Sequence, residues 1–351
     1  MNTTFPVRIT ASDRYDGMLD EVGRRALDCD GKVDAALQLA VTLGATVPLV
    51  GAGSTATLWS ALATVAAADV TVARVVEPHL DALAILSQAK PSDLDRVAVA
   101  EDSTWGVFAA ESPEAQLDAA ESADGWKLTG TKAWCSLAGS LSHALITAHT
   151  GGSSRRLFAV ALDQPGVVVR EGEWHANGLS AIASGAVDFT TVDAVPVGED
   201  GWYFHRPGFA WGGIGVAACW WGGAVGIARR AFDAARDREP DQVALMHLGA
   251  LDVALYTARV ALATAAETVD DPATDRDAAK IVAHRTRTVA ARVSEEVIER
   301  VGHALGPGPL SLEPDHARRV ADLQLYVRQH HAERDDVALA RKLLESRAAR
   351  W

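Results

Sequence analysis

The stretch DGWKLTGTKAWCSL, residues 124 to 137, places a bulky indole, Trp134, two residues before a small hydroxyl, Ser136. Its first half predicts a hairpin, with a turn at Asp124-Gly125, a short strand over residues 126–128 and a second turn over residues 129–131. Core filling would explain the tryptophan alone. It would not explain a large ring beside a hydroxyl where the chain leaves a hairpin, so the pair needs a second reason.

The composition is that of an ordinary globular protein. Of the 351 residues, 48% are hydrophobic and 23% are charged, and the chain is long enough for two or three packed units. The 33 basic and 46 acidic residues give a net charge of -13. This charge argues against nucleic acid or an anionic membrane surface as a partner.

The sequence carries no clear signal for membrane insertion or export. No apolar run reaches about 18 residues without a charge or several glycines, and residues 1–6 lack the basic-then-apolar layout of a secretory signal. Three scattered cysteines, Cys29, Cys135 and Cys219, favour a reducing compartment without a disulfide framework or a zinc site. We expect a cytoplasmic protein.

The hydrophobic pattern divides the chain into three parts. Residues 1–100 have apolar residues three or four positions apart, which predicts an N-terminal helical domain. Residues 101–205 are richer in Thr, Val and Gly with alternating apolar positions, which predicts a middle β domain. Residues 206–351 return to helical periodicity. The fold class is therefore α+β.

Local signals predict individual elements inside these parts. A helix should end at Lys90-Pro91, because proline cannot continue it. Strands are predicted over residues 158–162, 167–169 and 186–192, the last closed by Val195-Pro196. A loop should interrupt the C-terminal helices over residues 302–314.

The opening stretch and this three-part layout resemble the acyl-CoA dehydrogenase family. Members carry a segment much like Gly125-Trp126-x-Leu-x-Gly130-x-Lys132-x-Trp134-x-Ser136. In the family, the tryptophan packs beside the flavin ring and the hydroxyl residue bonds flavin atoms. The resemblance therefore implies that Trp134 and Ser136 contact the flavin. It also implies a middle β-barrel or sandwich domain and a C-terminal four-helix bundle.

The resemblance implies further cofactor contacts. Glu111 stands where the family's Thr-Glu-Pro turn begins the strand domain, which places Ala110 among the flavin-binding residues. His247 falls where the family has a histidine that meets flavin from a neighbouring subunit. Residues 277–302 resemble a helix whose final glycine pair, here beginning at Gly302, receives the partner's FAD pyrophosphate. We therefore expect FAD and at least a homodimer, or a homotetramer built as a pair of dimers.

The sequence departs from the family at several cofactor positions. The loop after Glu111 is short, and His303 stands at the second glycine of the pyrophosphate segment, with Glu299 at the usual glutamine. A carboxylate near a diphosphate is unfavourable unless a cation such as Arg300 offsets it. Residues 236–240 only partly match the segment that holds the adenine half.

The most important departure concerns the catalytic base. The family removes a proton alpha to a thioester carbonyl with a carboxylate opposite the flavin. Counting without a gap from Asp322 puts His330 at that position, and Glu333 follows on the same face if the segment is helical. The family's alternative base position is occupied here by Gly212-Gly213, which supplies no carboxylate. His330 and Glu333 are the predicted catalytic residues.

His330 can be interpreted in three ways, and the sequence leaves them open. Imidazole titrates near ~6.5, which suits a base at neutral pH. The ring could instead donate a hydrogen bond to a flavin hydroperoxide, as a histidine does in the monooxygenase branch of this fold. His330-His331 could also be a polar turn at the start of a helix.

Three functions follow from these observations. The leading one is an FAD-dependent α,β-dehydrogenase of an acyl-CoA or other acyl thioester, with hydride passing to flavin N5 and an electron-transfer flavoprotein as a candidate partner. The second is a two-component flavin monooxygenase of the same fold, which the weak pyrophosphate and adenine segments favour slightly. The third is a non-catalytic subunit that completes a partner's site.

Other patterns have structural explanations. Residues 213–218 match a dinucleotide-binding glycine pattern but follow no buried strand, so we interpret them as the start of a close-packed helix. Residues 51–55 lack the lysine of a phosphate loop and predict a capped helix start. Trp220-Trp221 should be buried. His330, His331 and Glu333 lack a third segment of ligands, so no metal is expected.

Overall fold

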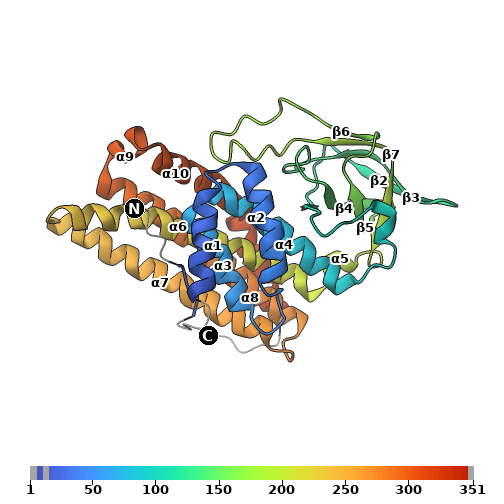
Figure 1. Ribbon diagram of the computed structural model, residues 1–351. Coiled ribbons are helices and arrows are strands. Elements are labelled where there is room, and N and C mark those ends of the chain that lie inside the picture. The colour runs from blue at the N-terminus through green and yellow to red at the C-terminus, as the bar shows by residue number, and fades with distance from the viewer. Residues whose placement is uncertain (1–5, 11–15, 347–351) are drawn as a thin grey trace.

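The computed structural model describes residues 6–10 and 16–346. The sequence argument against a secretory signal rests on residues 1–6. Of these, residues 1–5 lie outside the described residues. Helices occupy one side of the molecule and a β domain the other (Figure 1), with α4 beside the β domain. The middle β domain is flanked in the sequence by two helical parts, as the sequence predicts.

The N-terminal part contains four helices, α1 (Asp16–Asp28), α2 (Val33–Thr46), α3 (Thr55–Ala68) and α4 (Val70–Ala89). Asp69 separates α3 from α4, and its carboxylate accepts the amide of Val72 as the N-cap of α4. Helix α4 ends at Lys90, which has a φ of 47° and precedes Pro91. The predicted end of this helix is confirmed.

The β domain contains seven strands, β1 (Trp105–Phe108), β2 (Leu117–Ser122), β3 (Gly125–Lys132), β4 (His143–Gly151), β5 (Ser154–Ala161), β6 (Val167–Val169) and β7 (Val187–Val197). A short 3-10 helix, η2 (Leu94–Val97), precedes them. The strand order is β1-β4-β2-β3-β7-β5, and a further pairing of β4 with β5 closes the ring. Side chains such as Leu128, Ile146 and Phe158 fill one of the two cores of this domain.

The predicted second turn of the opening stretch is wrong. The hairpin turn at Asp124-Gly125 does join β2 to β3, but β3 continues through residues 129–131 to Lys132. The local irregularity is a register shift between Leu128 and Gly130. A side chain at Gly130 would overlap the carbonyl oxygen of Gln116, and its φ is +126°, so glycine is required there. Likewise, Pro196 lies inside β7 rather than closing it.

The C-terminal part contains α5 (Trp202–His205), α6 (Pro207–Asp237), α7 (Gln242–Asp270), α8 (Arg276–Leu305), α9 (Pro307–Leu312), α10 (Pro314–Tyr326), η3 (Val327–Gln329) and α11 (Glu333–Glu345). Helix α6 begins with the glycines at 208–215 and packs against α3 and α8, with Trp220 fully buried. The expected loop over residues 302–314 is wrong, because α8 runs through Gly302 and α9 occupies most of the remainder.

Two described helices are long and apolar enough to cross a membrane by length and composition alone, α6 from Gly208 and α7. The apolar window of α6 is 67% buried, so packing within the bundle explains it. The window of α7 is only 22% buried. Its apolar side chains therefore need a different explanation.

The close packing of α6 on α3 gives a stability prediction. A side chain at Gly222 would overlap backbone atoms of Ala63, whereas one at Gly249, in the middle of α7, would meet nothing within 4 Å. Gly222→Ala should lower the free energy of unfolding by about 1–3 kcal/mol, because two helices must separate. Gly249→Ala should raise it by up to about 1 kcal/mol through helix propensity. Denaturant titration of both variants is the measurement, and equal stabilities would contradict the prediction.

Candidate functional site

Trp134 lies on a turn immediately after β3. Its φ is 61° and its side chain is 58% exposed, although most large apolar side chains of this domain are buried. The amides of Cys135 and Leu137 donate to the carbonyls of Gly185 and Ala183, which fixes the turn against the segment before β7. The indole is therefore held on a fixed backbone and is free to contact a ligand.

Ser136 connects this turn to the helical part. Its hydroxyl shares a hydrogen bond of 2.8 Å with the Ser184 hydroxyl and accepts one of 3.0 Å from Nη2 of Arg74 on α4. A pocket of about 300 Å³ lies beside the turn, lined by residues that include 137–140 and 169–174. Two hydroxyls, a guanidinium and an exposed indole thus gather where the turn after β3 meets α4.

Ala110 and Glu111 lie close to the same turn. Ala110 is exposed just after β1, and the Glu111 carboxylate accepts a hydrogen bond of 2.7 Å from Nζ of Lys132, two residues before Trp134. His149 and Arg155 also pair with Glu111, at 3.1 and 3.3 Å. The three cationic or basic groups hold the pKa of the carboxyl below its usual range, against the effect of burial. The structure therefore places Ala110 and the Trp134 turn on adjoining segments.

Helix α4 carries three charged side chains toward the interior. Arg74, Glu77 and Asp81 are spaced by three and four residues, so they share one face of the helix. Arg287 of α8 and Arg206, just before α6, complete what we call the α4 polar cluster (Arg74, Glu77, Asp81, Arg206 and Arg287). Glu77 is 8% exposed, whereas the Asp81 side chain keeps 17% of its surface accessible.

The pKa values of the two carboxyls in this cluster are raised. Burial, followed by the nearby charge of Asp81, raises the pKa of Glu77 to about 7, while Arg74 and Arg287 act in the opposite direction. Burial also raises the pKa of Asp81, and Arg206, with Nη2 3.8 Å from Oδ1 of Asp81, opposes that shift. Glu77 therefore changes its charge in the neutral range.

Two glycines of α6 lie directly against these charges. A side chain at Gly212 would lie 2.6 Å from Oδ1 of Asp81, and one at Gly213 would lie 3.3 Å from Arg287. Arg287 donates to the carbonyls of Gly213 and Gln329, at 2.6 and 3.1 Å, and its guanidinium lies 4.9 Å from the Trp220 ring centre. Gly212, where the family's alternative base is absent, thus faces the Asp81 carboxylate of another helix.

Several polar atoms around the α4 polar cluster lack partners. Four of the seven buried side-chain polar atoms without a hydrogen bond among the described residues are Oδ1 of Asp81, Nε of Arg206, Nε1 of Trp220 and the Tyr326 hydroxyl. The Tyr326 hydroxyl lies close enough to Glu77 and Cys219 to interact with both electrostatically, but it has no partner at full hydrogen-bond geometry. Buried polar groups are normally satisfied, so such a concentration indicates a place for water or a ligand.

Asp322 fixes the segment opposite this cluster. Its Oδ1 accepts the Leu179 amide at 2.6 Å and its Oδ2 accepts the Thr71 hydroxyl at 2.8 Å. A side chain at Gly178 would overlap backbone atoms of Ala321, so the 177–180 segment packs directly on α10. One buried carboxylate therefore ties the β domain, α4 and α10 together.

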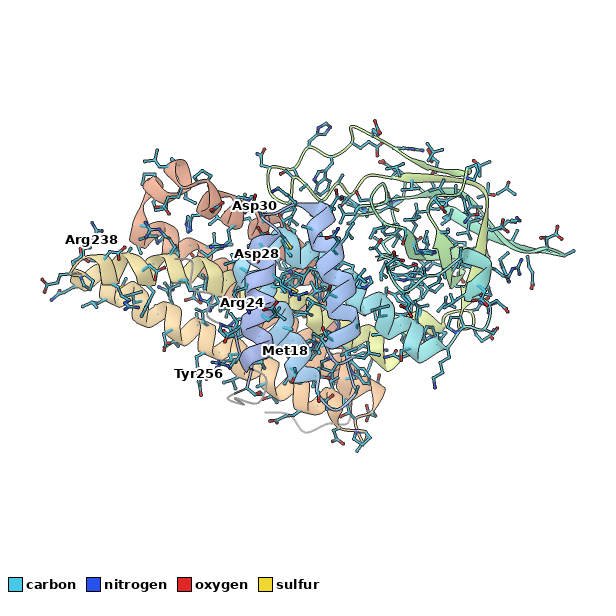
Figure 2. The ribbon with its side chains drawn as sticks, in the orientation of Figure 1. Met18, Arg24, Asp28, Asp30, Arg238 and Tyr256 are labelled. Atoms are coloured by element: carbon cyan, nitrogen blue, oxygen red, sulfur yellow. The ribbon has the colours of Figure 1, made fainter. Side chains whose placement is uncertain are left out.

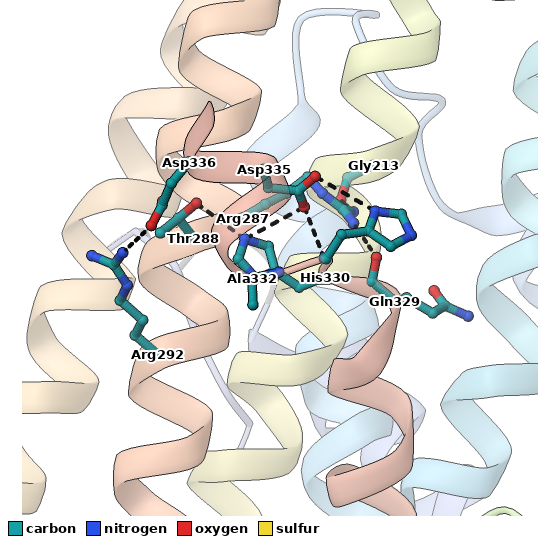
Figure 3. Close-up of polar contacts among 10 residues, drawn as sticks. Gly213, Arg287, Thr288, Arg292, Gln329, His330, Ala332, Asp335 and Asp336 are labelled. Carbon is teal, nitrogen blue, oxygen red and sulfur yellow. Dashed lines mark hydrogen bonds and ion pairs between the residues drawn. The ribbon is translucent and has the colours of Figure 1, made fainter. Parts of the chain in front are cut away.

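His330 has partners on both ring nitrogens (Figure 3). The Ala332 amide donates to Nδ1 at 3.2 Å, and Nε2 lies 3.1 Å from the Thr288 hydroxyl and 3.5 Å from Oδ2 of Asp335. Burial lowers the pKa of His330, against the charge of Asp335. A substrate proton could reach this ring only after one of these contacts broke.

Glu333 does not share a helix face with His330, so that expectation is wrong. His330 is extended, Ala332 has a φ of 49°, and α11 begins at Glu333, whose side chain is exposed. Both residues line a polar pocket of about 130 Å³ between α8 and α11. Ser136, whose partners are Arg74 and Ser184, does not line it.

His247 and Gly302 lie in the outer part of the bundle. His247 is buried on α7, 6.2 Å from the ring of His303 on α8, and its Nδ1 has no hydrogen-bond partner among the described residues. A side chain at Gly302 would meet nothing within 4 Å. Arg300 pairs with Glu296 at 2.6 Å, so its charge is already partly neutralised. Among the described residues, no hydrogen bond or ion pair joins His247 or Gly302 to the Trp134 turn.

Residues 199–332 match the family model described as acyl-CoA dehydrogenase, C-terminal domain. The match covers helices α5 to α10 and η3. No curated protein sequence matches the chain.

Solved structures extend this acyl-CoA dehydrogenase-like fold to the whole chain. KijD3 in complex with FMN and dTDP-3-amino-2,3,6-trideoxy-4-keto-3-methyl-D-glucose is 23% identical, with a TM-score of 0.77 over 96% of this chain and 94% of that one. The FAD complex of PigA is 15% identical, with a TM-score of 0.80 over 95% and 98%. Dibenzothiophene monooxygenase (TdsC) from Paenibacillus sp. A11-2 is 18% identical, with a TM-score of 0.75 over 94% and 96%.

The α4 polar cluster and Ser184 were missed by sequence reasoning. Arg74, Glu77 and Asp81 were the available signal, because they interrupt the apolar face of an otherwise buried helix at helical spacing. A charged residue on such a face needs a buried partner or a ligand. The sequence does not say that this face meets Ser136.

Asp322 provides a test of how the site is held together. Asp322→Ala should lower the free energy of unfolding by about 2–4 kcal/mol, because two hydrogen bonds to a charged group disappear and the Leu179 amide is left buried. Asp315→Ala, at an 88% exposed carboxylate of the same helix, should change it by less than about 1 kcal/mol. Chemical denaturation of both variants measures these changes. An equal loss of unfolding free energy in the two variants would refute a special role for Asp322.

Proposed function

We propose that the protein is a flavin-dependent oxidoreductase that oxidises a polar substrate with reduced flavin and oxygen, as two-component flavin monooxygenases do. The observation that carries this proposal is the α4 polar cluster, which lies beside Ser136 on the helical side of the candidate site. A buried alkyl chain would leave these charges desolvated and unpaired, at a cost of several kcal/mol. A polar substrate could bond to them instead.

The residues around the Trp134 turn fit a flavin. An exposed indole offers an aromatic face for a planar heterocycle, and Ser136, Ser184 and Arg74 offer hydroxyl and guanidinium groups for its polar edge. When bound, the flavin supplies two-electron chemistry. The chain would bind and orient it through the turn, and Arg74 would offer positive charge that stabilises a reduced, anionic flavin.

Structural neighbours support the choice of an oxygen-using enzyme. Their descriptions include a dibenzothiophene monooxygenase, a complex with FMN and an amino-sugar nucleotide, and a nitrososynthase from Micromonospora carbonacea var. africana. One neighbour binds FAD and others bind FMN. We propose a flavin and test both forms.

Acyl thioester dehydrogenation remains the second candidate function. It needs a base opposite the flavin, and His330 and Glu333 stay predicted catalytic residues for it. The bonding of both His330 nitrogens and the exposure of Glu333 make neither a free base in this structure. An electron-transfer flavoprotein would be the partner only for this second function.

The two functions predict opposite spectra. Protein carrying reduced FMN or FAD should be reoxidised rapidly by oxygen, and protein carrying oxidised flavin should not be bleached anaerobically by a panel of acyl-CoAs. Stopped-flow absorbance of the flavin measures both. Bleaching by an acyl-CoA would establish the dehydrogenase, and the absence of any flavin binding would favour a non-catalytic subunit.

Matched serine variants test the flavin contact within this experiment. Ser136→Ala should weaken flavin binding by up to about tenfold, the effect of one lost hydrogen bond. Ser153→Ala, in the exposed turn between β4 and β5, should leave it unchanged. An unchanged affinity for Ser136→Ala would remove Ser136 from the flavin site.

We also propose that a second copy of the chain covers the outer side of α7. Six large apolar side chains of this helix are 44–64% exposed, Val243, Leu245, Met246, Val253, Tyr256 and Val260. Figure 2 shows Tyr256 on the outer side of α7. An exposed apolar stripe of this kind marks an interface, and a dimer through it would give His247 and Gly302 a neighbour to meet.

Charges on this stripe should dissociate the dimer. The double change Val253→Asp and Tyr256→Asp should give a monomer with nearly unchanged helix content, because both side chains are exposed in one chain. Val168→Asp, at a 56% exposed apolar residue of β6, should leave the dimer intact. Sedimentation velocity measures the outcome, and a monomeric wild-type protein would overturn the proposal.

A further inference from the structure

We propose that Glu77 is the proton-exchanging residue of this site and that Asp81 passes the proton between Glu77 and solvent. The inference rests on the flavin-dependent oxidation proposed above. It assigns a chemical task to a buried carboxyl. Neither the proposed contacts to flavin nor the packing of the bundle requires this group.

The position of Glu77 on α4 supports this role. Arg74, one turn earlier, donates to Ser136 at 3.0 Å and so reaches the proposed flavin wall. Asp81, one turn later, keeps 17% of its side chain accessible, although its Oδ1 is buried close to Gly212. The face of one helix therefore runs from Ser136 through Glu77 to a carboxylate whose side chain is partly accessible.

The bonding of Glu77 differs from that of a structural carboxylate. Asp322 is similarly buried but accepts hydrogen bonds from Leu179 and Thr71. Glu77 forms no ion pair in the described part of the chain. The Tyr326 hydroxyl lies close enough to favour the Glu77 anion, but it is outside the geometry of a full hydrogen bond. A buried carboxyl without fixed partners destabilises a fold, so its presence points to a task in the site.

The surroundings of Glu77 let it hold or release a proton. The titratable groups that face it are Arg74 and Asp81 on α4, Tyr203 on α5, Cys219 on α6, Arg287 on α8 and Tyr326 on α10. Burial and Asp81 favour the neutral acid, while the two arginines favour the anion. The resulting pKa of about 7 lies where general acids and bases work best.

The step itself is a proton transfer. An N–H or O–H bond of the bound substrate or of the reduced flavin breaks, its electron pair stays on the nitrogen or oxygen, and a new O–H bond forms on the Glu77 carboxylate. The proton then leaves through Asp81 to water, which restores the anion. A bound reduced flavin would supply the two electrons that oxygen takes up in the oxidation.

The first test uses the protein without flavin. Because the folded-state pKa of about 7 exceeds the unfolded value of 4.5, Glu77 contributes stability below 4.5 that is lost as pH rises through about 7. The denaturant midpoint of wild type minus that of Glu77→Gln should therefore decrease as the pH is raised from 4.5 to above 7. Glu121→Gln, at an exposed residue of β2, should follow wild type at every pH. If the denaturant midpoints of wild type and Glu77→Gln differed by the same amount at every pH, the inference would be overturned.

The second test uses protein loaded with reduced FMN. Oxygen should release hydrogen peroxide at a rate that changes through an apparent pKa of about 7 in wild type and in Glu121→Gln. Glu77→Gln should lose this dependence and slow by about 10²-fold, the lower end of a general base's contribution, with FMN affinity unchanged. If peroxide release by Glu77→Gln depended on pH as it does in wild type, Glu77 would have only a structural role.

A second variant covers the case in which Glu77→Gln does not fold. Asp81→Asn removes the charge that raises the pKa of Glu77, so both pH profiles should move to lower pH. Unmoved profiles would overturn the inference. If the wild-type protein binds no flavin, the proposed function fails and the catalytic role fails with it, whereas failure of the Glu77 variants alone leaves flavin-dependent oxidation standing.

Discussion

The close contact between α6 and α3 organises the rest of the molecule. Gly222 and Gly226 lie one turn apart on α6 and meet backbone atoms of Ala63 and Ala67, one turn apart on α3. Any side chain at these glycines would push the two helices apart. Because α6 also packs against α4, α7, α8 and α10, this contact determines where each of those helices can lie.

The same helix also meets charged side chains closely at its other end. A side chain at Gly212 would lie 2.6 Å from Oδ1 of Asp81 and one at Gly213 would lie 3.3 Å from Arg287, so these glycines, in the first turns of α6, accommodate the two charged groups. The close approach of α3 at residues 222–226 and of Asp81 at Gly212 are therefore two consequences of one glycine-rich sequence. The polar site depends on both, since they set how closely α3 and α4 approach α6.

Two buried carboxylates differ in how their charge is stabilised in the protein interior. Asp322 is satisfied by hydrogen bonds and holds three segments together, so its cost of burial is offset by specific contacts. Glu77 lies among two arginines and Asp81 without comparable contacts. An acyl-CoA dehydrogenase-like scaffold with a charged interior next to Ser136 is better suited to a polar substrate than to an alkyl chain, because only polar groups can replace the lost hydration.

The sequence by itself determined the features that depend on neighbouring residues. The end of α4 at Lys90-Pro91, the β2–β3 turn at Asp124-Gly125 and the glycine-rich start of α6 follow from local backbone preferences. The motif ending at Ser136 pointed to the fold because it is continuous in the chain. Only the tertiary structure decided that Arg74 reaches Ser136, that Gly302 lies within α8 and that both nitrogens of His330 are bonded. These features depend on packing between segments far apart in the chain, where long-range contacts override local propensity and no short stretch of sequence records the partner.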